Sequence, residues 1–223
     1  AYKIKKPVDF GFLDFSTLER RRHCCDEEVR LNHRFAPTLY LDVVAITRTG
    51  SRIGIGGDGE VIEYAVRMRQ FPTAMQLDRR LAAGVLDAKD LVTFARTLAE
   101  VHAALPRCNP DAPFGTAAAV LGPVRENFAQ IAGSPFAGVS AGLVTELARW
   151  SETRHTALSA LFGQRRADGF VRECHGDLHL SNLVALDDGI HAFDCIEFSE
   201  GLRWIDVISD VAFLVMDCAV RGR

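Results

Sequence analysis

The sequence lacks the features that would mark a membrane protein or a nucleic-acid-binding protein. No apolar run approaches the roughly 18 residues of a membrane span, and no signal peptide precedes the first expected strand. Its 26 lysines and arginines are outnumbered by 29 aspartates and glutamates, whereas general nucleic-acid binding needs a basic surface. We therefore expect neither a membrane nor a nucleic acid among its partners.

The sequence also lacks any C-x-x-C pair and the dense cysteine framework of a small secreted domain. Six cysteines are present: Cys24, Cys25, Cys108, Cys174, Cys195 and Cys218. Cysteines without such pairs or such a framework are typically reduced, buried and chemically inert thiols. We therefore expect a cytoplasmic protein.

Internal repeats and low-complexity tracts are absent too, and neither end looks like a natural terminus. The chain starts without Met inside a strand-like stretch and stops at Arg223, just after an apolar helical segment. We expect a piece of a longer protein. With 223 residues, 48% of them hydrophobic, the chain is long enough for one large domain or two lobes with a substantial core.

The first residues alternate apolar side chains with lysines. This period of two predicts a strand that carries Lys3 and Lys5 on the same face. Ser16 and Glu19 have the spacing of a capping box, which predicts a helix extending to about Phe35. A lysine strand is thus followed by a helix that contains glutamates.

Three further strands are expected, at residues 41–46, 52–55 and 61–68. The sequence Gly56-Gly57-Asp58-Gly59 lacks the Lys-Ser/Thr pair and the following helix of a phosphate-binding loop, so it predicts a plain hairpin turn. Residues 1–68 should therefore form a small, mostly antiparallel sheet with one helix.

From residue 73 onward the sequence is rich in alanine and leucine. It predicts helices at residues 74–83, 89–105, 116–132 and 143–161, and then a further helix at residues 204–220. This change from strand patterns to helical patterns favours a domain boundary near residue 68 and an α+β fold class.

The most informative stretch is residues 171–194, V-R-E-C-H-G-D-L-H-L-S-N-L-V-A-L-D-D-G-I-H-A-F-D. It places Asp177, Asn182 and Asp194 where two short apolar runs meet polar loops. The Asp-Asp-Gly turn between the runs predicts a hairpin. Such a hairpin would carry Asp194 back toward Asp177.

Three interpretations of this stretch are open. His175, Asp177 and Asn182 have the H-x-D-x-x-x-x-N spacing of phosphotransferases of the protein-kinase type, which would make Asp177 the proton acceptor and Asn182 and Asp194 magnesium ligands. Alternatively, His175, Asp177 and His191 could form a two-histidine, one-carboxylate iron site, although this leaves the other polar residues without roles. The plainest alternative is capping and hairpin polar groups in an ordinary domain.

H-G-D-L-H-L-S-N followed by F-D resembles the signature of the aminoglycoside phosphotransferase family, the small-molecule branch of the protein-kinase-like fold. Y-K-I-K-K-P, E-E-V-R-L-N and F-D-C-I-E-F-S-E-G-L-R-W-I-D-V-I-S-D-V-A-F-L resemble bacterial proteins that carry this domain ahead of a P-loop ATPase-like domain. The resemblance covers nearly the whole chain. It implies a two-lobed fold, with a nucleotide-binding lobe at 1–68 and a catalytic and substrate lobe at 69–223. It also implies that an N-terminal hairpin and a C-terminal remainder are missing.

The resemblance implies a role for each residue of the catalytic loop. Asp177 would be the catalytic base, and Asn182 and Asp194 would bind Mg²⁺. His179 lies where protein kinases have a lysine near the transferring phosphate, so its help should be smaller and pH-dependent; a loop-shaping hydrogen bond is the alternative. His175 should anchor the loop.

The resemblance implies the ATP contacts as well. Lys3 would contact the α- and β-phosphates with Glu28 as its helix partner; Lys5 and Glu27 are the respective alternatives. The backbone of a hinge strand would pair with adenine, at residues Glu63, Ala65 and Val66. Asp210 is expected to brace the loop or the start of a helix.

The expected function is ATP-dependent phosphoryl transfer to a hydroxyl of a small molecule, with ATP and Mg²⁺ as cofactors. Gly176 stands where protein kinases have an arginine, and no A-P-E segment follows, so regulation by loop phosphorylation and peptide substrates are not expected. The alternative is a nucleotide-binding pseudokinase that regulates an attached ATPase domain. Without the missing hairpin, nucleotide binding should be weak.

The acceptor should bind among the helices of residues 73–161, which contain no diagnostic cluster. An acidic lining would favour an amine, although scattered surface carboxylates are the commoner explanation. The candidate residues are Glu146, Glu152, Glu197 and Glu200.

Overall fold

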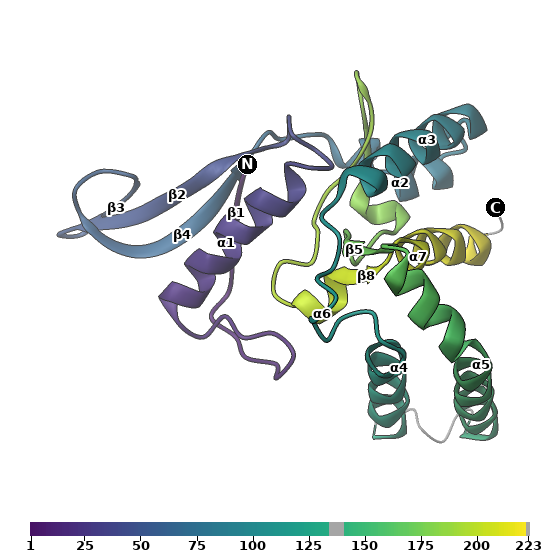
Figure 1. The fold of residues 1–223 in the computed structure, drawn as a ribbon. Coiled ribbons are helices and arrows are strands. Elements are labelled where there is room, and N and C mark those ends of the chain that lie inside the picture. The colour runs from purple at the N-terminus through teal and green to yellow at the C-terminus, as the bar shows by residue number, and fades with distance from the viewer. Residues whose placement is uncertain (134–140, 222–223) are drawn as a thin grey trace.

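A computed structural model describes residues 1–133 and 141–221. Its first part is a four-stranded antiparallel sheet in the order β1-β4-β2-β3. The strands are β1 (Tyr2–Ile4), β2 (Tyr40–Thr49), β3 (Arg52–Ile55) and β4 (Glu60–Met68). The helix α1 (Leu18–Asn32) packs against β4 and β2 (Figure 1). The predicted strands and helix are confirmed. The hairpin predicted at the glycine-rich turn of residues 56–59 is wrong, because β3 pairs with β2 and not with β4. This turn carries the chain across β2 to its other side, and the hairpin turn lies between β2 and β3 instead.

The start of α1 differs from the prediction by one residue. The helix is capped by Thr17, whose hydroxyl oxygen accepts a hydrogen bond from the backbone N–H of Arg20 at 3.2 Å. The predicted cap, Ser16, instead donates its hydroxyl and its N–H to the Asp14 carboxylate. Asp14 thus forms a local turn that takes Ser16 out of the helix.

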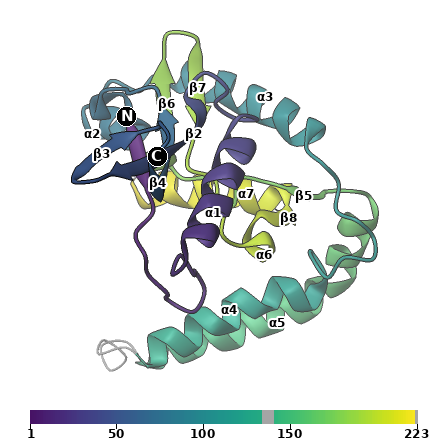
Figure 2. The same ribbon diagram turned by 90° about the vertical axis from the view of Figure 1, so that its left-hand side faces the viewer.

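The second part begins with helices. The predicted segment at 74–83 is split into η1 (Thr73–Met75) and α2 (Leu77–Ala82) by Gln76, which is extended at ψ 142°. Gln76 bridges to Val184 and donates its side-chain amide to the Ser181 carbonyl at 2.9 Å, so contacts with a distant segment override the local helical pattern. The next helices confirm the prediction: α3 (Ala88–Ala104), α4 (Ala117–Ala132) and α5 (Ala141–Ala167). Helices α4 and α5 lie side by side as an arm (Figure 2).

The remaining elements surround the most informative stretch of the sequence. They are β5 (Val171–Glu173), η2 (Leu180–Asn182), β6 (Leu183–Leu186), β7 (Gly189–Ala192), α6 (Glu200–Arg203), β8 (Trp204–Asp206) and α7 (Val207–Val220). Strands β6 and β7 form the predicted hairpin. The helix predicted from Trp204 starts three residues later, because β8 pairs with β5.

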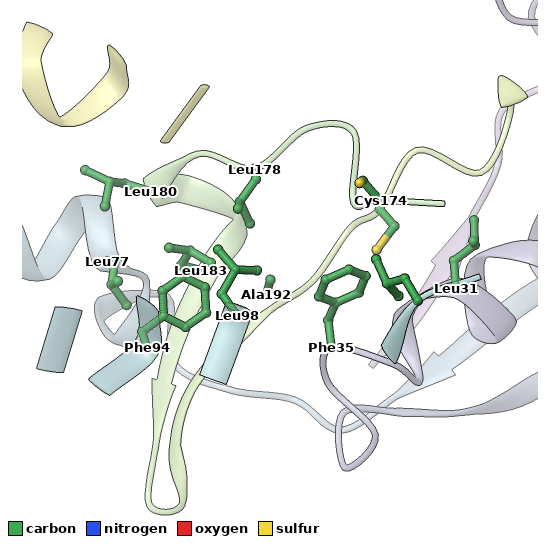
Figure 3. Close-up of a cluster of buried hydrophobic side chains, with 12 residues drawn as sticks. Leu31, Phe35, Leu77, Phe94, Leu98, Cys174, Leu178, Leu180, Leu183 and Ala192 are labelled. Carbon is green, nitrogen blue, oxygen red and sulfur yellow. The ribbon is translucent and has the colours of Figure 1, made fainter. Parts of the chain in front are cut away.

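Two hydrophobic clusters connect the sheet and α1 with the rest of the molecule. In the larger one, Leu31 and Phe35 lie with Leu178, Leu183 and other buried residues of the following helices and hairpin (Figure 3). The smaller cluster includes Tyr40, Val66 and Val184. The chain is thus a mixed α/β molecule with an antiparallel sheet and several helices, in keeping with a kinase-like fold; the division into lobes at residue 68 stays a prediction.

The cysteines follow the prediction for the most part. Cys24, Cys25, Cys174 and Cys195 are buried, and Cys108 and Cys218 are half-buried; all six are free thiols. Burial raises the pKa of Cys24 to about 11 and that of Cys25 to about 12. Within the described residues, no helix is both long and apolar enough to cross a membrane.

Candidate active site

The loop between β5 and η2 is held rigidly at its beginning. The backbone N–H groups of His175 and Gly176 donate to the two carboxylate oxygens of Asp210 at 3.0 and 2.9 Å. The His175 ring is fully buried, and its Nε2 lies 2.8 Å from the Phe193 carbonyl. Burial lowers the pKa of His175. His175 therefore anchors the loop and Asp210 braces it, as predicted.

Gly176 explains why no arginine precedes Asp177. Its φ is +86°, which residues with a Cβ rarely adopt, and a Cβ placed here would lie 2.8 Å from the Leu202 carbonyl oxygen. The close approach of the backbone at Leu202 and the left-handed conformation both require glycine.

Asp177 and Asn182 contact each other directly. The Asn182 amide nitrogen donates to the Asp177 carboxylate at 3.1 Å and to its carbonyl at 3.0 Å. His179 Nε2 lies 3.4 Å from the same carboxylate. The Asp177 side chain stays 39% exposed, so it is positioned by two neighbours and still open to a substrate.

The hairpin returns Asp194 to this site. The N–H of Phe193 donates to the Asn182 carbonyl at 2.9 Å, which places Asp194 next to Asn182 in space. Asp194 has a φ of +66° and is the one non-glycine residue with positive φ in the part of the chain that the structure describes. Its N–H donates to the Tyr40 hydroxyl at 3.0 Å, which helps to hold this unfavourable conformation.

Lys3 joins the hairpin to α1. Its Nζ donates to Glu28 Oε1 at 2.7 Å and also to the Asp194 carboxylate. Burial alone would lower the pKa of Lys3, but the charges of Glu28 and Asp194 outweigh it and raise that pKa. Lys3, Glu28 and Asp194, which are far apart in the sequence, thus meet at one point.

The two alternatives named from the sequence have other partners. Lys5 is only 4% exposed, and its Nζ contacts Glu28 Oε2 at 2.7 Å and Glu197 Oε1 at 2.5 Å. Glu27 binds Arg30. The geometry therefore places Lys3 at the open site, with Glu28 buried behind it, and leaves Lys5 inside.

The same loops line an adjacent cavity of about 280 Å³. Its walls include Lys3, Phe193 and Asp194 together with residues 69–71, which follow β4. The three residues predicted to pair with a nucleobase, Glu63, Ala65 and Val66, do not line this cavity. Ala65 and Val66 are fully buried and have β1 on one side and β2 on the other, so no strand edge is free there.

Glu63 faces away from the cavity as well. Its carboxylate accepts hydrogen bonds from Arg21 of α1 at 2.8 and 2.9 Å. The segment that borders the cavity, residues 69–71, carried no signal in the sequence beyond its place after the last strand.

Comparison with known proteins places this geometry in a family. Residues 21–222 match the phosphotransferase enzyme family. The chain belongs to this family. The match includes Glu28, Asp177, Asn182 and Asp194, whereas Lys3 precedes it.

Relatives of this family member occur in mycobacteria. One uncharacterized protein of Mycobacterium bovis and two of Mycobacterium tuberculosis are 30% identical over 223 residues, which is 100% of this chain. The chain spans 43% of the length of these relatives. No solved structure matches.

The iron-site alternative is wrong for this phosphotransferase family member. His191 lies on β7, where its ring contacts the Asp188 carboxylate at 2.8 Å and the Phe35 carbonyl at 3.4 Å. His175 is buried against Phe193, so the three expected ligands do not converge. Over residues 1–133 and 141–221, the sole group of potential metal ligands lying close together is His102, Cys174 and Asp210.

That buried group is part of the loop brace. His102 Nε2 lies 3.1 Å from Asp210 Oδ2, which also accepts the N–H of His175. His102 lies on α3 and is only 5% exposed. No local signal distinguished it, because its partner lies 108 residues away.

Two of the carboxylates proposed for an acidic acceptor lining are engaged elsewhere. Glu152 forms an exposed ion pair with Arg125, and Glu197 is buried against Lys5. Both carboxylates are thus already neutralised by a basic side chain.

Proposed function

We propose that this chain transfers the γ-phosphoryl group of Mg-ATP to a hydroxyl of a small molecule. The observation that carries this proposal is the contact of Lys3 with both Glu28 and Asp194 beside the cavity. Kinase-type phosphotransferases use such a lysine for the nucleotide phosphates, with a helix glutamate as its partner.

The residues present suit a magnesium nucleotide. The Asn182 amide oxygen and the Asp194 carboxylate are hard oxygen ligands of the kind Mg²⁺ prefers. Asn182 donates its Nδ2 to Asp177, so its Oδ1 is the atom that would hold the metal. Bound Mg-ATP would supply the phosphoryl group and the positive charge that stabilises it during transfer.

The protein's own contribution is positioning. Asp177 would orient the acceptor hydroxyl and accept its proton, because Asn182 and His179 hold the carboxylate in place. Lys3 would exchange its contact with Asp194 for the nucleotide phosphates. The cavity bordered by residues 69–71 would take the base.

We also propose the wider setting that the sequence resemblance implies. The acceptor would be a small hydroxylated molecule bound near the helices of residues 73–161. A C-terminal P-loop domain would follow in the full-length protein; the relatives, of which this chain spans 43%, are long enough to hold a further domain. Free thiols at all six cysteines support a reducing, cytoplasmic setting.

The test measures Mg-ATP binding and ATP consumption with a panel of sugars, amino alcohols and aminoglycosides. Asp177→Asn should lower turnover by about 100- to 10,000-fold, the usual contribution of a general base, with Mg-ATP affinity nearly unchanged. Turnover that this substitution leaves intact would contradict the role of Asp177. Tight Mg-ATP binding without turnover on any acceptor would instead favour the pseudokinase alternative.

A further inference from the structure

Five charged side chains of alternating sign form a continuous chain that runs from the interior to the open site. In order they are Glu197, Lys5, Glu28, Lys3 and Asp194. The contacts from Glu197 to Lys5, from Lys5 to Glu28 and from Glu28 to Lys3 measure 2.5, 2.7 and 2.7 Å, and Lys3 contacts Asp194. The proposed nucleotide site uses only the last three groups. Lys5 and Glu197 have no role in it.

The two lysines have the same chemistry and nearly the same position. They lie two residues apart on one face of the segment that contains β1, and both bind the same carboxylate. They differ in their second partner, Asp194 for Lys3 and Glu197 for Lys5, and in their exposure: the side chain of Lys3 is 39% exposed and that of Lys5 is 4% exposed. Phosphate groups would attract the ammonium group of either lysine. A further contact must therefore hold Lys5 in the protein interior.

Glu197 is the group that retains Lys5. It lies three residues after Asp194 on a loop that is itself fixed. The Ile196 N–H donates to the His175 carbonyl, and Arg203 donates to the Glu197 carbonyl, both at 3.0 Å. The Glu197 side chain is 6% exposed, so its charge acts on Lys5 with little screening by water.

Lys5 in turn fixes the orientation of Glu28. One lysine occupies Oε1 and the other occupies Oε2, and Glu28 is fully buried. With both oxygens taken, the carboxylate has one favourable orientation, which directs Oε1 toward Lys3.

We propose that Glu197 retains Lys5 as the internal partner of Glu28, so that Lys3 alone is presented to the nucleotide phosphates. Lys5 and Glu197 are positioning residues; neither touches the substrate. This inference rests on the proposed function, since it concerns how the same site selects its lysine.

If the ion pair of Lys5 and Glu197 only stabilised the fold, its loss would not change which lysine lies beside the nucleotide. Chemical labelling of the lysines distinguishes this possibility from the proposal. An acyl-phosphate derivative of ATP acylates the amine beside its phosphates, forming an amide and releasing ATP. Mass spectrometry then identifies the modified lysine. In the wild-type protein we expect labelling of Lys3, prevented by excess Mg-ATP, and none of Lys5.

Glu197→Gln removes the charge but keeps the size of the side chain. We expect labelling of Lys5 to rise at least about tenfold, and the Kd for Mg-ATP to rise by about fivefold, in line with the loss of one charge-assisted contact. The double variant Lys5→Met/Glu197→Gln should return all labelling to Lys3. Its Kd should stay raised, because Oε2 of Glu28 has lost its partner.

Glu173→Gln is the matched control, because Glu173 is another buried carboxylate bound to basic side chains but does not touch either lysine. This variant should lose stability and still be labelled at Lys3 only.

A folded Glu197→Gln protein with wild-type labelling and affinity would overturn the role of Glu197. If that variant does not fold, a double variant with wild-type Kd would overturn it equally. Absence of Mg-ATP-protected labelling in the wild type would instead overturn the proposed function, and this inference with it.

Discussion

Two residues with left-handed backbone conformation lie at the two ends of the candidate site. Gly176 precedes the predicted catalytic aspartate, and Asp194 is the predicted metal ligand. Gly176 has no Cβ, so the left-handed conformation costs it little. Asp194 has a Cβ, and its conformation is stabilised by the hydroxyl of Tyr40 at its N–H and the ammonium of Lys3 at its carboxylate. Both conformations thus direct neighbouring polar groups toward the candidate site.

We predict that Gly176→Ala destabilises the protein more than a substitution that adds only backbone strain. Gly57→Ala is the matched control, because Gly57 has a φ of +85° and nothing within 4 Å of an added Cβ. The control should lose about 1 kcal/mol from left-handed strain. Gly176→Ala should lose a further 1–3 kcal/mol, roughly, from the clash with Leu202. Urea denaturation measures both; equal losses would show that the loop yields to the added methyl group.

At the scale of elements, α1 is the helix that brings a carboxylate to the lysine strand. It begins at Thr17 and packs against β4 and β2, so Glu28 faces inward while Arg30 stays half exposed. The edge strand β1 next to it provides Lys3, and the segment that follows β1 provides Lys5. Helix position relative to this strand therefore determines whether the ion pairs form.

We predict that Thr17→Ala lowers the free energy of unfolding by about 1 kcal/mol, the usual cost of losing an N-cap side chain. Ser16→Ala, which removes a hydroxyl one residue earlier, should cost less, because the Ser16 hydroxyl contacts Asp14 and, at 3.4 Å, Arg20 in an exposed turn and caps no backbone N–H of the helix. Thermal unfolding of both variants measures the difference. A larger loss for Ser16→Ala would show that the helix begins one residue earlier in solution.

At the scale of the whole molecule, Glu173 joins segments from both parts of the chain. It accepts from Arg30 and Arg34 of the N-terminal part and from Arg203, the last residue of α6. Burial would raise the pKa of Glu173, but the hydrogen bonds from Arg30 and Arg203 and the charge of Arg34 outweigh it and lower that pKa to about 2.

This lowered pKa predicts a loss of stability in acid. A glutamate without these partners titrates near 4.5, so between pH 4.5 and 2 the unfolded chain binds more protons than the folded one. The contribution of Glu173, about 3 kcal/mol, should be complete above that range and vanish as the pH falls toward 2. Glu173→Gln should be less stable at pH 7 and lose less stability on acidification. Parallel pH profiles for the two proteins would contradict this prediction.

The sequence by itself determined the features that depend on local spacing. Alternation placed Lys3 and Lys5 on one face, the interval from Asp177 to Asn182 matched phosphoryl-transfer chemistry, and a turn signal returned Asp194 toward them. These features follow from the periods of strands and hairpins, which neighbouring residues set.

Only the tertiary structure decided between residues that local patterns cannot distinguish. It separated Lys3 from Lys5 and Glu28 from Glu27, kept Ala65 and Val66 away from the cavity that residues 69–71 line, and buried His102 against Asp210. In each case the deciding contacts join segments far apart in the chain. Burial and strand pairing depend on those contacts, so no window of sequence contains them.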